Sequence, residues 1–102
     1  MENQKLPTIE HVVMVFNEGA TPEAIGDALA ESTTFLKKCP GFIERQVSYS
    51  QEKGAYLDYI LWEDDAKAEA AAELFPEAPE TQAFQALLDA AEVMHLGLVY
   101  RE

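Results

Sequence analysis

Three short segments of the sequence, at 9–16, 56–63 and 93–100, are rich in β-branched and aromatic residues, which favours strands over helices. They read IEHVVMVF, YLDYILWE and VMHLGLVY. Because neighbouring side chains in a strand point to opposite faces, each of these strands has two faces that are mostly apolar. A strand of this kind is typically covered on both sides. The fold must therefore bury both faces of its sheet.

The first strand is followed by a well-marked helix. The segment TPE at 21–23 is typical of a helix start, because Thr can cap, Pro fits the first helical position and an acid is favoured at the positive end of the helix dipole. The sequence CPG at 39–41 ends this helix. The segment 43–50 then alternates between apolar and polar residues, which predicts a strand with one wet face. A turn at 51–54 joins it to 56–63 as a hairpin.

The second half of the chain predicts a broken helical region and a last strand. An Ala- and Glu-rich helix is expected over 64–74, with an aspartate as its cap. Pro76 and Pro79 interrupt it, because proline lacks the amide hydrogen that a helix interior needs. Helix is expected to resume over 80–90, and the apolar segment 93–100 is expected to form the final strand.

The predicted order is β-α-β-β-α-β, which is the ferredoxin-like α+β plan: a four-stranded antiparallel sheet with both helices on one face. The length of 102 residues fits a single domain spanning 1–102. Helices on one face leave the other apolar face of the sheet open, which soluble monomers rarely tolerate. We therefore expect a symmetric homodimer that packs two sheets face to face.

Composition and motifs exclude several classes of function. The formal net charge is −12, which disfavours nonspecific binding to nucleic acid or to an anionic membrane. No apolar run approaches the length of about 18 residues that a membrane span needs. Cys39 is the single cysteine, so an intrachain disulfide is impossible, and 1–8 has no apolar run typical of a signal peptide. We expect a cytoplasmic protein without a metal or cofactor, because zinc and nucleotide motifs are absent.

Several segments resemble the dimeric α+β barrel superfamily. EHVVMVFNEGATPEAI and CPGF are similar to stress-responsive A/B barrel domains, whereas YLDYILWED and AFQALLDAAEVMHLG are similar to the antibiotic biosynthesis monooxygenase-like group. The resemblance implies a homodimeric barrel that binds a small aromatic or apolar ligand. It leaves three roles open: a cofactor-independent monooxygenase, a polyketide-cyclase-like acid/base enzyme, and a non-catalytic structural or ligand-binding dimer.

Asp58 is the first candidate catalytic residue. Tyr56, Ile60 and Trp62 share its strand face, and a carboxylate on such an apolar face needs a partner, a water molecule or a raised pKa. Two interpretations remain open: Asp58 pairs with Arg45 on the neighbouring strand, or it is a general base in an apolar cavity. The monooxygenase-like group often carries a polar residue four positions before a Trp. Asp58 and Trp62 match that spacing, although characterised members commonly have Asn where Asp58 stands.

The two histidines are also candidate catalytic residues. His95 lies in an apolar strand, where it either fills the core or transfers protons, and in the superfamily the last strand commonly lines the ligand cavity. His11 matches a position where the A/B barrel group often has His. Trp62 and Tyr56 are candidate ligand-binding residues, with Trp62 equally interpretable as core. Gly97 either marks a bulge or leaves room for a ligand.

Asp58 and His95 form a coupled hypothesis. If both side chains face the space between sheet and helices, Asp58 could accept a proton and His95 could donate one. If they lie on opposite faces of the sheet, no coupled site exists.

Overall fold

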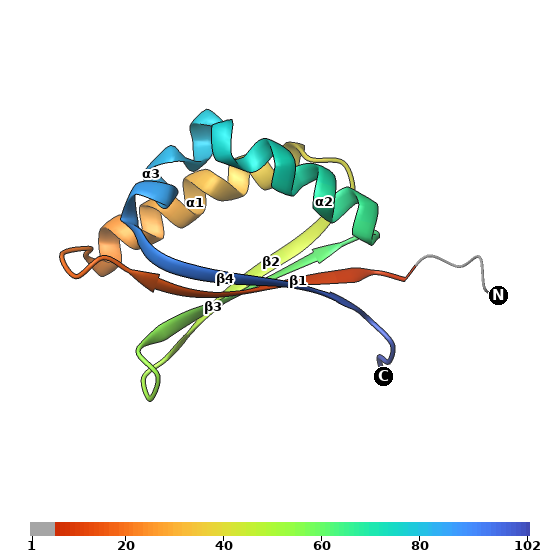
Figure 1. Cartoon of the computed structure of the whole chain (residues 1–102), viewed down its shortest axis with the longest axis horizontal. Helices are drawn as coiled ribbons and strands as arrows, with labels where there is room; N and C mark the ends of the chain where they lie inside the picture. The colour runs from red at the N-terminus through yellow and green to blue at the C-terminus, as the bar shows by residue number, and fades with distance from the viewer. Residues whose placement is uncertain (1–5) are drawn as a thin grey trace.

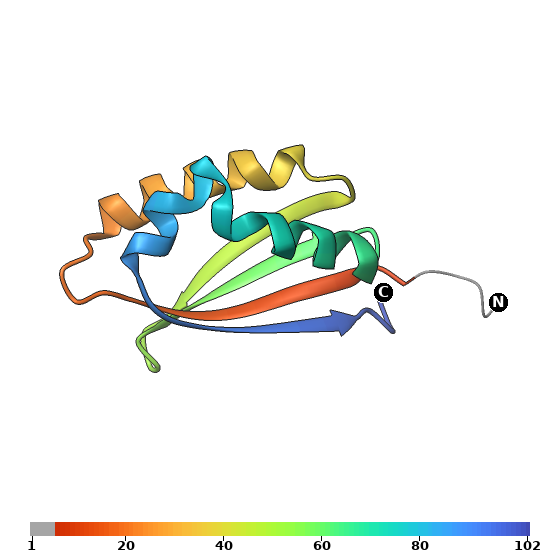
Figure 2. The same cartoon turned by 45° about the horizontal axis from the view of Figure 1, so that its top comes forward.

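The computed structural model describes residues 6–102 and has two layers, a sheet and a set of helices on one of its faces (Figures 1 and 2). The sheet is antiparallel, its strand order is β2-β3-β1-β4, and its strands are β1 (Thr8–Phe16), β2 (Phe42–Ser50), β3 (Ala55–Trp62) and β4 (Leu88–Gly97). The helices are α1 (Pro22–Lys38), α2 (Asp65–Leu74) and α3 (Gln82–Leu87). The predicted ferredoxin-like fold is confirmed.

Helix α1 begins and ends where the sequence predicts. The Thr21 hydroxyl accepts a hydrogen bond from the amide of Ala24 at 3.1 Å, and Pro22 occupies the first turn. Lys37 and Lys38 lie in the last turn, where positive charge is favoured. The buried face of this helix packs onto the sheet and forms one wall of a pocket between the sheet and the helices.

Two short 3-10 helices, Phe75–Glu77 and Pro79–Thr81, separate α2 from α3. They begin next to the two prolines, as expected from the loss of the amide donor. The Thr81 hydroxyl stabilises this connection by donating toward the carbonyl oxygens of Phe75 (2.7 Å) and Ala78 (3.0 Å). The chain therefore turns back over the sheet without a long loop.

The boundary between the last helix and the last strand was predicted wrongly. Helix was expected over 80–90 and strand over 93–100, whereas α3 ends at Leu87 and β4 spans Leu88–Gly97. Strand β4 pairs with almost the whole of β1, and these backbone hydrogen bonds override the helical propensity of the Leu-Asp-Ala-Ala sequence. The side chain and backbone of Asn17 also bind the last α3 carbonyls, those of Ala86 and Leu87, at 3.0 and 2.8 Å.

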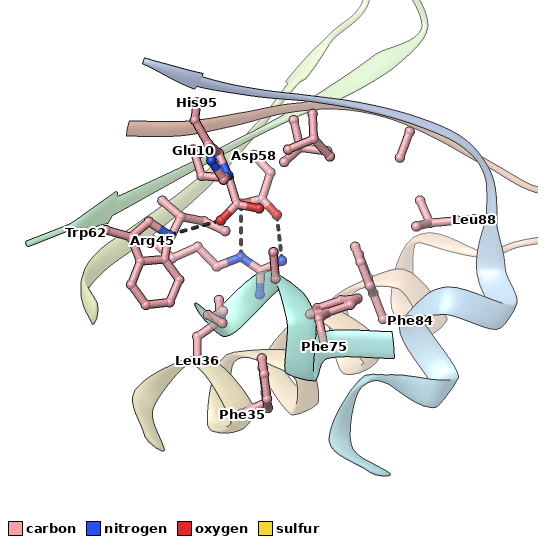
Figure 3. A pocket seen from close by; sticks show the side chains of 16 residues that line it. Glu10, Phe35, Leu36, Arg45, Asp58, Trp62, Phe75, Phe84, Leu88 and His95 are labelled. Carbon is pink, nitrogen blue, oxygen red and sulfur yellow. Dashed lines mark hydrogen bonds and ion pairs between the residues drawn. The ribbon is translucent and has the colours of Figure 1, made fainter. Parts of the chain in front are cut away.

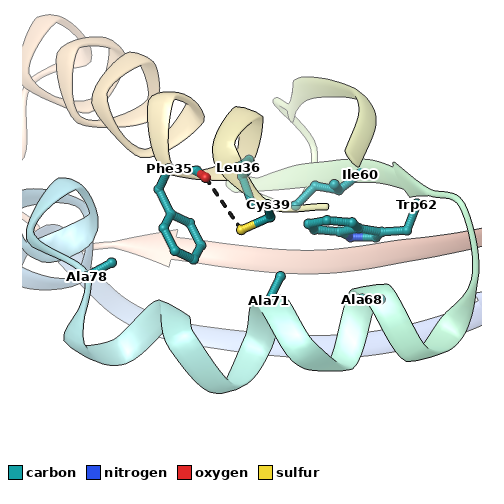
Figure 4. Close-up of a cluster of buried hydrophobic side chains, with 8 residues drawn as sticks. All are labelled: Phe35, Leu36, Cys39, Ile60, Trp62, Ala68, Ala71 and Ala78. Atoms are coloured by element: carbon teal, nitrogen blue, oxygen red, sulfur yellow. Dashed lines mark hydrogen bonds between the residues drawn. The ribbon is translucent and has the colours of Figure 1, made fainter. Parts of the chain in front are cut away.

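A hydrophobic cluster holds α2 against the sheet (Figure 4). Small side chains on α2 face the large ring of Trp62, and the Cys39 thiol donates to the carbonyl of Phe35 at 3.4 Å. The cluster comprises Phe35, Leu36, Cys39, Ile60, Trp62, Ala68, Ala71 and Ala78. Alanine at the contact positions lets the helix approach the sheet closely. Among the described residues, no helix is long and apolar enough to cross a membrane.

Gly41 is required at the junction of α1 and β2. Its φ angle is +88°, and a Cβ built there would lie 2.6 Å from Cβ of Lys67. Gly41→Ala should lower the free energy of unfolding by about 1–3 kcal/mol, because the backbone is strained and α2 must move. Urea denaturation measures this. Gly19→Ala is the control, since nothing lies within 4 Å of its added Cβ, and equal stability of the two variants would contradict the prediction.

Candidate functional site

A pocket of about 340 Å³ lies between the helix-covered face of the sheet and the helices (Figure 3). All four strands contribute to its wall, and most of its lining is apolar. Its large apolar side chains include Phe35, Trp62, Phe75, Phe84, Leu88 and Val93. Four polar side chains also line it: Glu10, Arg45, Asp58 and His95. A volume of this size is at the lower end of the range found for small-molecule sites.

Asp58 is fully engaged by Arg45. The Arg45 guanidinium donates from Nε to Oδ1 at 2.9 Å and from Nη2 to Oδ2 at 2.7 Å. The two side chains are only 7% and 3% exposed, so this is a buried, bidentate ion pair. The interpretation in which Asp58 pairs with Arg45 on the neighbouring strand is the one that the structure shows. Both oxygens of this carboxylate are therefore committed to a cation.

The other end of the same guanidinium reaches helix α1. Nη1 of Arg45 donates toward the Ser32 hydroxyl (2.8 Å), the Thr33 hydroxyl (2.9 Å) and the Leu29 carbonyl oxygen (3.2 Å). Arg45 thus joins β2 and β3 to α1 through one planar group. Asp58 neutralises the positive charge of Arg45, and the hydrogen bonds from Nη1 hold the guanidinium against α1.

Glu10 is a pocket residue that sequence reasoning missed. It lies on β1, on the same face as Val12 and Met14, and Nε1 of Trp62 donates to its Oε1 at 3.0 Å. Burial raises the pKa of Glu10, while the Trp62 hydrogen bond and the charge of His95 act in the opposite direction. The signal was present in the sequence, because Glu10 is an acid on an otherwise apolar strand face, as Asp58 is.

His95 faces the same pocket from β4. It is the cross-strand partner of Glu10, and its Nδ1 lies 3.7 Å from Oδ1 of Asp65 on α2. Its Nε2 is buried and has no hydrogen-bond partner among the described residues. Asp65, Glu69 and His95 place one potential metal-ligand atom each within 4.8 Å of one another. Asp65 and Glu69 are exposed carboxylates, which are common on acidic surfaces without an ion.

Three of the predicted site residues converge on the pocket. Asp58, Trp62 and His95 all line it, so Asp58 and His95 lie on the same face of the sheet (Figure 3). Both side chains therefore face the space between the sheet and the helices, which is the position that the coupled hypothesis requires. Both oxygens of Asp58 accept hydrogen bonds from Arg45, however, as in the first of the two interpretations, so a free general base is not what the structure shows.

The three other predicted site residues, His11, Tyr56 and Gly97, lie outside the pocket lining. His11 follows Glu10 on β1 and therefore points to the opposite face of the sheet, with Tyr59 and Met94 as cross-strand partners. Tyr56 packs against the ring of Phe16, at 5.1 Å between centroids.

Gly97 does not open space for a ligand in this chain. Gly97 is the cross-strand partner of Thr8, near the end of β4, and a Cβ added to it would meet only Leu6 Cδ1, at 3.8 Å. That distance is an ordinary contact, so neither a close approach nor a bulge explains this glycine.

The sequence matches no protein-family model and no curated protein. The fold is similar to that of a single-substitution variant of SnoaB, a cofactor-independent oxygenase from Streptomyces nogalater, with a TM-score of 0.74 and 18% identity over 96% of this chain and 97% of that one. A candidate antibiotic biosynthesis monooxygenase from Nitrosomonas europaea has a TM-score of 0.73 and 14% identity over 95% and 94% of the two chains.

A dimeric ferredoxin-like protein from Thermobifida fusca is also similar, with a TM-score of 0.68 and 9% identity over 93% of each chain. At these identities the likeness concerns the fold. It confirms the ferredoxin-like architecture that the resemblance to the dimeric α+β barrel superfamily implies.

Asp58→Asn should destabilise the protein by about 3–5 kcal/mol, because it leaves the Arg45 charge buried without its counter-ion. This exceeds the change of about 1 kcal/mol or less expected for an exposed pair. Chemical denaturation measures the difference, and Asp89→Asn, which removes an exposed carboxylate from β4, is the control. The double variant Arg45→Met/Asp58→Leu should recover much of the loss, and a double variant no better than Asp58→Asn would contradict the assignment.

Proposed function

We propose that the pocket binds a small, mostly apolar aromatic molecule and that the protein oxygenates an electron-rich member of that class without a cofactor. One observation carries this proposal: an aromatic-lined space of about 340 Å³ whose polar groups, outside the Arg45–Asp58 pair, are Glu10 and His95. A mostly apolar pocket with very few oriented polar groups suits a substrate that supplies its own electrons. The similarity of the fold to SnoaB, a cofactor-independent oxygenase, supports the same reaction class.

The reaction balances without any further reductant. A dihydroxyarene loses a hydroxyl proton to the imidazole of His95, which lines the pocket, and the electron-rich ring carbon then forms a bond to O₂. The proton returns to the distal oxygen, giving a hydroperoxide, which loses water to leave a carbonyl. For 1,4-dihydroxynaphthalene the sum is diol plus O₂ to hydroxyquinone plus H₂O. One oxygen atom enters the product and the other leaves as water.

The acid/base alternative built on both histidines has less support. His11 and His95 lie on opposite faces of the sheet, so one bound ligand cannot contact both within a single chain. A non-catalytic ligand-binding role differs from the proposal only in its chemistry, and the same experiment separates the two.

Oxygen consumption with 1,4-dihydroxynaphthalene tests the proposal, after the rate of spontaneous oxidation is subtracted. One O₂ should be consumed per hydroxyquinone formed. His95→Gln should lower kcat/KM by about 100-fold or more, because it removes the proton acceptor. His11→Gln, the matched change on the other face of the sheet, should leave it unchanged. Binding of the diol without protein-dependent oxygen consumption would reduce the function to ligand binding.

We infer that a second copy of this chain covers the open face of the sheet. The helices all lie on the other side (Figure 1), and this face carries Met94 at 50% and Leu96 at 41% exposure. Exposed apolar side chains in one continuous sheet face are typical of an interface. Its apolar residues include Ile9, Val13, Val15, Leu57, Met94 and Leu96, and His11, Tyr59 and Glu92 lie among them. A two-fold axis brings the same surface of both copies together, and the similar protein from Thermobifida fusca is dimeric.

Val13→Glu should shift the protein from dimer to monomer, because it buries a second negative charge in this face beside Glu92, its cross-strand partner. Light scattering after size-exclusion chromatography, at micromolar concentration, gives the mass directly. Leu74→Glu introduces the same charge at an exposed leucine on α2 and should leave the dimer intact. A monomeric wild-type protein would overturn the inference.

A further inference from the structure

Glu10 differs from Asp58 in what remains free on its carboxylate. Arg45 occupies both oxygens of Asp58, whereas the one hydrogen bond that Glu10 makes among the described residues is to Oε1, from the neutral indole of Trp62. Its second oxygen, Oε2, therefore keeps its capacity to accept a hydrogen bond. Figure 3 shows Glu10 and His95 side by side on the wall of the pocket.

The charges that act on Glu10 come from the other three strands of the sheet. Asp58 on β3 repels it, and Arg45 on β2 attracts it but is already paired with Asp58. His95 on β4 attracts Glu10 only when its imidazole is protonated, and on its other side His95 meets Asp65 of α2. Glu10 is thus a partly buried carboxylate with little compensating charge, and burial raises its pKa.

A carboxylate in this position discriminates between ligands. When it is ionised, a carboxylate accepts hydrogen bonds and cannot donate them. It therefore binds a hydroxyl or N–H group and rejects a carbonyl or an anion at the same place. A buried acceptor left without a donor costs more than the hydrogen bond itself contributes, which makes the discrimination large.

We propose that Glu10 is the specificity-determining residue of the pocket, and that Oε2 selects aromatic ligands that carry a neutral hydroxyl group. This inference rests on the aromatic ligand of the proposed function, but not on oxygenation.

Three probes of nearly equal size test the selection at pH 7: 1-naphthol, 1-methoxynaphthalene and 1-naphthoate. Isothermal titration calorimetry should show that 1-naphthol binds at least 10-fold more tightly than the other two. In Glu10→Gln the preference over 1-naphthoate should fall at least 10-fold, because the amide carries no charge and can donate. Glu73→Gln, an exposed acid on α2, should keep the wild-type preference.

A second readout needs neither ligand nor activity. Trp62 is the only tryptophan in the sequence, and its indole donates to Glu10, so its fluorescence should report the ionisation of that carboxyl. The emission should titrate with a midpoint above the ordinary pKa of glutamate, and this step should be absent from Glu10→Gln. The step should remain in Glu73→Gln.

The outcomes separate the two proposals. Naphthol selectivity without oxygen consumption would remove the oxygenase function and keep the role of Glu10. Equal affinities for the three probes, a failure of all three to bind, or unchanged selectivity in Glu10→Gln would overturn the role of Glu10. Loss of selectivity together with a well-folded variant, judged by an unaltered urea midpoint at pH 5, would support it.

Discussion

The guanidinium of Arg45 joins elements that are far apart in the sequence. It binds Asp58 with two hydrogen bonds and extends to the hydroxyl of Ser32, so β2, β3 and α1 meet at one buried group. Removing one charged partner leaves the other charge buried without compensation. Such a change therefore lowers the free energy of unfolding more than replacing both partners by apolar residues does. The pair also sets the electrostatics of the pocket, because two opposite charges at its wall neutralise each other. Glu10 and His95 are what remains.

The sequence contained most of the architecture and part of the site. Period-two alternation and the Thr21 cap led to β1, β2 and β3 within one residue at each end, to helix α1 and to the ferredoxin-like order. The start of β4 was missed because the segment after Leu87 has helical propensity, and only its pairing with β1 makes it a strand. Local patterns carry no information about such long-range pairing.

The site residues show the same division. Alternation places Asp58 and His95 toward one face or the other, but it cannot say which of the two faces the helices cover. Three-dimensional register was needed to place His11 on the uncovered face and Glu10 within the pocket. The pairing of Asp58 with Arg45 was one of two open interpretations, because a strand pattern does not reveal how far a long side chain reaches.

Small side chains explain why the pocket exists at all. Ala71 and Ala72 line it from α2, and Ala91 lines it from β4, where larger residues would fill the space. Protein interiors are normally packed to crystal-like density, and an unfilled apolar space costs stability in proportion to its volume. Ala71, together with Ala68 on the same helix, also packs in the cluster that contains Trp62, whose indole donates to Glu10. A single Ala-rich helix thus packs against Trp62 and leaves open space beside it, and Trp62 orients the carboxylate that β1 places at the wall of that space.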